Sequence, residues 1–108
     1  MAINEALFAS SKVISKTVKL SDGSEHELFF RELPALEFRR FALMEESKDE
    51  EKQAQSMSNI IAASLCEADG TLALTIEQAN QLTAQATIAI MQAIMEVNGN
   101  GLGKLKKG

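Results

Sequence analysis

The pattern of apolar and polar residues changes near residue 34, from the alternation typical of strands to the longer spacing typical of helices. Residues 13–20 (VISKTVKL) contain β-branched side chains, and their second half alternates lysines with apolar residues. Residues 25–31 (EHELFFR) resume an extended pattern. Between them, residues 21–24 (SDGS) supply turn chemistry, since an Asp-Gly pair accepts positive φ. These segments predict a β-hairpin.

A hairpin of two strands is only marginally stable in water when it stands alone. Its apolar side chains must therefore contact another layer of the protein or a partner. Alternation places Leu28 and Phe30 on one face of the second strand and Phe29 on the other. We expect Leu28 and Phe30, or alternatively Phe29, to face that second layer.

Helical spacing begins after Pro34, which suits the first position of a helix because its missing N–H is not needed there. The following ALEFRRFALM predicts the first helix. Phe38 and Phe41 share one face of this helix, whereas Leu36 and Leu43 lie on another. Apolar groups therefore cover more than half of its circumference, which indicates contacts beyond its own core.

Further helices follow the charged run at residues 45–52 (EESKDEEK), which we interpret as a solvated helix end or a link between helices. Apolar spacing predicts a second helix from Ala54 through about Cys66. The sequence EADGT then predicts a turn, with Gly70 free to adopt the left-handed conformation that ends helices.

The last third of the chain carries clear helix-start signals. Thr75 and Gln78 have the spacing of a capping box and predict a short helix from Ile76 to about Leu82. Thr83 can cap the final helix. One apolar stripe of that helix comprises Ile90, Ile94 and Val97. A Met-rich flank lies beside this stripe and comprises Ile88, Met91 and Met95.

These elements predict an α+β fold, in which an N-terminal β-hairpin is followed by a small bundle of about four helices. We expect residues 1–97 to form a single domain. Residues 98–108 hold four of the six glycines and three lysines without an acidic residue, whereas residues 1–97 hold all fifteen acidic residues. This difference in composition predicts that residues 98–108 form a flexible basic tail on an acidic domain.

Composition narrows the class of protein. The chain is 45% hydrophobic and has neither Trp nor Tyr, so its core must consist mainly of Ile, Leu, Ala and Met. The N-terminus lacks a basic leader, and no apolar run approaches the roughly 18 residues that a membrane span requires. We therefore expect a cytoplasmic protein without a membrane partner. The net charge of −4 argues against general nucleic-acid binding.

The sequence offers little catalytic or metal-binding chemistry. His26 is the only histidine and lies between two glutamates, which suggests an exposed position in the hairpin. Cys66 is the only cysteine, and its place beside Leu65 indicates a small buried side chain rather than a nucleophile. The charged run lacks the glycine turn and the regular ligand spacing of a calcium loop. We predict no enzymatic activity, no cofactor and no metal site.

Four short blocks occur in a distinctive order along the chain: FFREL at 29–33, LCEADG at 65–70, LTIEQA at 74–79 and EVNG at 96–99. In this combination the chain resembles the tail assembly chaperones of long-tailed bacteriophages. The blocks span most of residues 16–103, and none of them is a catalytic motif.

The resemblance implies a phage or prophage protein that binds the long helical tape-measure protein in the host cytoplasm. Such chaperones keep the tape-measure protein soluble until the tail tube polymerises around it, and they are absent from the mature virion. Many members also have a longer form, made by programmed frameshifting, which recruits the major tail protein. Lys106 and Lys107 are encoded only by AAA or AAG, which is compatible with a slippery A-rich run at this point.

The family has no binding signature that can be transferred to this chain, so the candidate partner-binding residues rest on helix patterning. They are Phe38, Phe41, Leu43, Met44, Met91 and Met95. We expect them to be shared among the core, self-association into a homo-oligomer, and the client. Two other functions stay open at this point: a structural tail completion or connector protein of the virion, and a small regulatory binding module.

Overall fold

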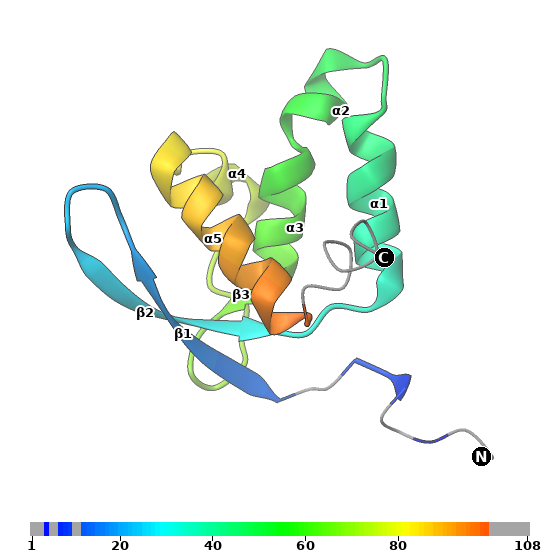
Figure 1. The fold of residues 1–108 in the computed structure, drawn as a ribbon. Coiled ribbons are helices and arrows are strands. Elements are labelled where there is room, and N and C mark those ends of the chain that lie inside the picture. The colour runs from blue at the N-terminus through cyan, green and yellow to red at the C-terminus, as the bar shows by residue number, and fades with distance from the viewer. Residues whose placement is uncertain (1–3, 5–6, 10–11, 100–108) are drawn as a thin grey trace.

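The structure is a computed structural model that describes residues 4, 7–9 and 12–99. In this part of the chain, a small antiparallel sheet carries a layer of helices on one face (Figure 1). The strands are β1 (Val13–Lys19), β2 (Glu25–Arg31) and β3 (Leu65–Cys66), and the helices are α1 (Ala35–Glu45), α2 (Glu50–Ala54), α3 (Ser56–Ser64), α4 (Ile76–Ala79) and α5 (Ala84–Val97). The predicted α+β class is confirmed.

The predicted hairpin is present, because β1 and β2 pair in antiparallel fashion from Val13 opposite Arg31 to Lys19 opposite Glu25. Its turn depends on glycine, since Gly23 has a φ of +90°. One oxygen of the Asp22 carboxylate accepts hydrogen bonds from the Ser24 hydroxyl at 2.6 Å and from the Ser24 N–H at 2.8 Å. These bonds lower the pKa of Asp22 because they stabilise its charged form.

The same turn chemistry recurs after β3, at the turn that the sequence predicts there. Gly70 has a φ of +91°, and Asp69 accepts hydrogen bonds from the N–H of Thr71 at 3.0 Å and from its hydroxyl at 2.7 Å. The pKa of Asp69 is lowered for the same reason. The turn brings Leu72 back beside Cys66, with which it forms an isolated antiparallel bridge.

The three longest helices lie side by side, and α5 is the one in closest contact with the sheet (Figure 1). Helix α5 lies against β1 and β2, α3 packs against α5, and α1 packs mainly against α3 and α2. Phe30 is fully buried in this core, whereas the neighbouring Phe29 is half-buried on the other face of the sheet. The face of β2 that carries Phe30 and Leu28 is therefore the one that meets the helices. The core residues are Val18, Phe30, Leu33, Ile60, Ile61, Leu65, Ala79, Ile90, Ala93 and Ile94.

One predicted helix is wrong in its boundaries. The segment from Ala54 to Cys66 is not continuous, because the chain breaks at Gln55 between α2 and α3. It also leaves the helix at Leu65, where Leu65 and Cys66 pair with Phe30 and Phe29 of β2. The described residues thus contain five helices and a third strand. The backbone hydrogen bonds to β2 decide this outcome, and helical periodicity does not reveal such a long-range pairing.

The predicted helix starts after residue 74 are confirmed. Gln78 donates its N–H to the Thr75 hydroxyl at 3.1 Å, and its side-chain oxygen accepts from the Thr75 N–H at 2.9 Å, which completes the capping box. Thr83 accepts from the N–H of Ala86 at 3.1 Å and caps α5. Helix α4 is shorter than predicted, because it ends at Ala79 rather than near Leu82.

Polar contacts join the end of β2 to the ends of two helices. The Arg31 guanidinium donates to the carbonyl of Ala63 at 2.9 Å, and the buried Ser64 hydroxyl donates to the carbonyl of Arg31 at 3.0 Å. The Asn98 side chain accepts from the Leu33 N–H at 2.9 Å. These contacts fix α3 and α5 relative to the strand that precedes α1.

The predicted basic tail lies mostly outside the described residues, which end at Gly99. Asn98, the first residue of the predicted tail, belongs to the packed domain through its bond to Leu33. The division into a domain at 1–97 and a tail at 98–108 otherwise stays a prediction.

Replacement of Phe30 tests the position of the core. We expect Phe30→Ala to lower the free energy of unfolding by about 3–5 kcal/mol, because it leaves a cavity among fully buried side chains. Phe29→Ala is the matched control and should have a smaller effect, because Phe29 is only half-buried. Chemical denaturation measures both values. Equal losses would contradict the assignment of the inner face.

Replacement of Asn98 tests the contact between α5 and β2. We expect Asn98→Ala to lower the free energy of unfolding by about 1–2 kcal/mol, since the part-buried Leu33 N–H then loses its acceptor. Asn80→Ala, at an exposed position, is the control. The same denaturation experiment would contradict this role if the two variants were equally stable.

Candidate partner-binding surface

Four of the candidate residues lie on α1, and they differ in how far their side chains are exposed. Phe38 and Phe41 are half-buried and pack against the core. Met44 is also half-buried, and its sulfur lies 3.3 Å from the amide nitrogen of Asn59 on α3. Leu43 instead lies on the outer side of the helix and is 63% exposed. Only Leu43 among these four therefore offers most of its surface to a partner.

The outer side of α1 holds a second exposed leucine that the candidate set omitted. Leu36 is 57% exposed, and it lies two helical turns before Leu43 on the same face. Helix α1 has no fully buried residue. Contacts with α3 and α2 cover its inner side, while the leucines of its outer side face solvent.

Helix α5 contributes a strip of larger apolar side chains. Met91 and Met95 are both half-buried, and Met91 packs against the core. Ile88 lies on the same side of the helix by its spacing and is 57% exposed. Methionine side chains are flexible and polarisable, so such a strip can adapt to different apolar partners. Ile88 was missed as a candidate, although its helical spacing marks it.

The candidate residues thus lie on two helices that both pack against α3. Their role in binding a partner stays a prediction.

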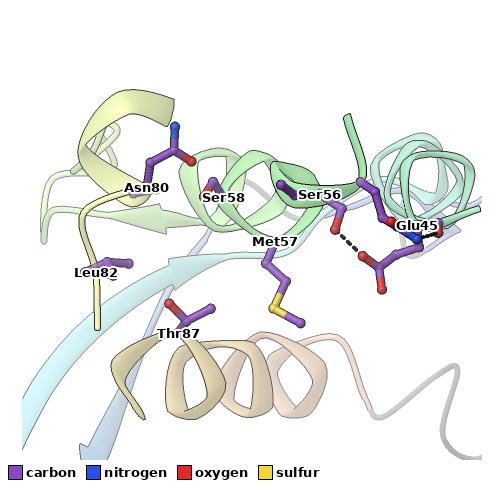
Figure 2. Close-up of a pocket in the computed structure, with 10 residues that line it drawn as sticks. Glu45, Ser56, Met57, Ser58, Asn80, Leu82 and Thr87 are labelled. Carbon is purple, nitrogen blue, oxygen red and sulfur yellow. Dashed lines mark hydrogen bonds between the residues drawn. The ribbon is translucent and has the colours of Figure 1, made fainter. Parts of the chain in front are cut away.

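A small hollow lies where α2, α3, α4 and the start of α5 approach one another (Figure 2). Its volume is about 260 Å³. Met57 extends from α3 toward α5, and Thr87 extends toward it from α5 (Figure 2). The Ser56 hydroxyl donates a hydrogen bond to the Glu45 carboxylate at one end of the hollow. Most of the remaining lining consists of small or polar side chains, among them Ser58 and Asn80.

The reactive side chains lie apart from this hollow. Cys66 is buried, as predicted, and burial raises the pKa of its thiol, so the nucleophilic thiolate is disfavoured. His26 is exposed on the hairpin, as predicted, and one of its ring nitrogens lies 2.9 Å from the Ser24 hydroxyl. The described part of the chain contains no group of three or more His, Cys, Asp or Glu side chains that could hold a metal ion.

No helix within residues 12–99 combines the length and the apolar character that crossing a membrane requires.

The amino-acid sequence matches a model of a known protein family. A family model described as phage tail assembly chaperone, TAC, matches residues 3–98. The match covers every strand and helix of the described structure. Comparisons with the curated proteins and with the solved structures found no significant match.

The two sides of α1 should respond differently to mutation. We expect Phe41→Ala to lower the free energy of unfolding by about 2 kcal/mol or more, because Phe41 packs against the core. Leu43→Gln should change it by no more than about 0.5 kcal/mol, because Leu43 is mainly in contact with water. Denaturant titration of both variants measures the difference. A large loss for Leu43→Gln would show that the outer side is needed for folding.

Proposed function

The chain belongs to the phage tail assembly chaperone family, and we propose that it binds the tape-measure protein of its phage and keeps that protein soluble during tail assembly. The match over residues 3–98 is the observation that carries this proposal. It covers the whole packed part of the chain rather than one motif. In this proposal the chain acts in the host cytoplasm and leaves before the virion is complete.

The exposed apolar side chains give this function a physical basis. Leu36 and Leu43 on α1 and Ile88 on α5 are each more than half exposed. A long helical client exposes apolar stripes until the tail tube surrounds it. Contact between such a stripe and an exposed helix face removes apolar surface from water on both partners, and this stabilises the complex.

The proposal assigns a binding role rather than a catalytic one. The buried thiol of Cys66 and the exposed ring of His26 lie on different parts of the sheet, at β3 and in the hairpin, respectively. Neither is placed to activate the other as a nucleophile and base. A longer, frameshifted form that recruits the major tail protein, and self-association of the chain, are further parts of the proposal.

Co-expression with the tape-measure protein tests the function. We expect the tape-measure protein to be insoluble when expressed alone, because its apolar stripes associate with one another. With the chain present it should be soluble and co-elute with the chain in size-exclusion chromatography. Light scattering on the same column gives the stoichiometry and the oligomeric state.

An unrelated small acidic protein is the control for co-expression, and it should not rescue solubility. A tape-measure protein that is soluble alone and never co-elutes with the chain would contradict the proposal. Detection of the chain in purified mature particles by mass spectrometry would instead support a structural role in the virion.

A further inference from the structure

The outer face of α1 combines exposed leucines with two arginines. This face consists of Leu36, Arg39, Arg40 and Leu43, and all four are exposed. Their spacing of i, i+3, i+4 and i+7 places them on one side of the helix. We refer to these four residues as the Leu-Arg face.

The Leu-Arg face is not part of the packed interior. Phe38 and Phe41 hold the opposite side of α1 against the core. Arg40 forms an ion pair with Glu37 at 3.4 Å, but its side chain remains 52% exposed. An exposed pair within one helix stabilises the fold only slightly. The arginines are therefore available to a partner.

The charge of this face is opposite to that of the protein as a whole. The chain carries a net charge of −4, yet both side chains between the leucines on this face are cationic. The acid nearest to them, Glu37, lies beside the face and, among the described residues, pairs with Arg40 alone. Glu46 is an exposed acid beyond Leu43, at the end of α1, and does not lie between the leucines. Contact with this face therefore selects a partner by charge as well as by apolar area.

We propose that the Leu-Arg face docks an amphipathic helix whose apolar stripe is flanked by Asp or Glu. Leucines two turns apart match the repeat of an apolar stripe on a second helix. Guanidinium groups between them can form paired hydrogen bonds with carboxylates beside that stripe. This inference rests on the proposed function, because it specifies the chemistry of the tape-measure segment that the chain binds.

A second copy of the chain fits this face poorly. In an antiparallel pairing of two α1 helices about a two-fold axis, Arg39 of one copy would meet Arg40 of the other. In a parallel pairing, each arginine would meet its own equivalent. Both arrangements place four guanidinium groups together and reduce affinity. An acidic partner helix removes this repulsion.

Two designed helical peptides test the charge preference without assuming any client. They share one leucine stripe, flanked by Glu in one peptide and by Lys in the other. We expect the Glu peptide to bind the full chain at least about tenfold more tightly at low salt, and we expect this preference to shrink at high salt. Titration calorimetry measures both affinities. Equal affinities, or no binding of either peptide, would overturn the inference.

Charge reversal at Arg39 and Arg40 tests whether the preference for the Glu peptide comes from the Leu-Arg face. Arg39→Glu combined with Arg40→Glu should abolish the preference for the Glu peptide and weaken binding of the tape-measure protein about tenfold or more at low salt. Lys48→Glu combined with Lys52→Glu is the matched control, since it makes the same change in net charge at exposed positions beside and within α2. Circular dichroism checks that both variants are folded.

The outcomes separate this inference from the proposed function. If the arginine variant binds the Glu peptide and the tape-measure protein as the control does, the Leu-Arg face is not the docking site. If the unmodified chain prefers the Glu peptide but does not bind the tape-measure protein, the face is supported and the proposed client is wrong.

Discussion

The end of β2 is the point on which the arrangement of the helices depends. Arg31 and Ser64 join this strand to the end of α3, and Asn98 joins the segment that follows it to the end of α5. These bonds satisfy backbone groups that would otherwise be buried without partners, which is costly. Because α1 begins directly after this segment, the same bonds determine where α1 leaves the sheet. The position of its outer face is thus a consequence of contacts made before the helix starts.

Local chemistry in the sequence was sufficient to predict the elements that it controls. The Asp-Gly turn at residues 22–23 predicted the hairpin, and Thr75 with Gln78 predicted the start of α4. Helical spacing extends the predicted second helix through Leu65 and Cys66. Their pairing with Phe30 and Phe29 links segments far apart in the sequence. No local signal reports such a pairing, so a two-residue strand of this kind is difficult to predict.

For the candidate surface, too, local sequence predicts one part and packing between distant segments decides the other. Helical spacing already separated Leu36 and Leu43 from Phe38 and Phe41. It could not decide which pair faces the interior, because both pairs are apolar and either could form the buried side. Packing of α1 against α3 makes that choice. The structure packs Phe38 and Phe41 against the core and leaves Leu43 exposed, so the predicted partner surface on α1 combines residues from both sides of the helix.

A chaperone for an apolar client must expose apolar surface without associating with itself through that surface. In the proposed function, the arginines between the leucines of α1 meet both requirements. They place positive charges beside the exposed leucines, and these charges repel the same face of a second copy. In the docking that we propose, the same charges attract a client helix with acidic flanks and disfavour a basic one. If the Leu-Arg face binds as we propose, its selectivity comes from charge, while its leucines supply most of the apolar area that is removed from water on binding.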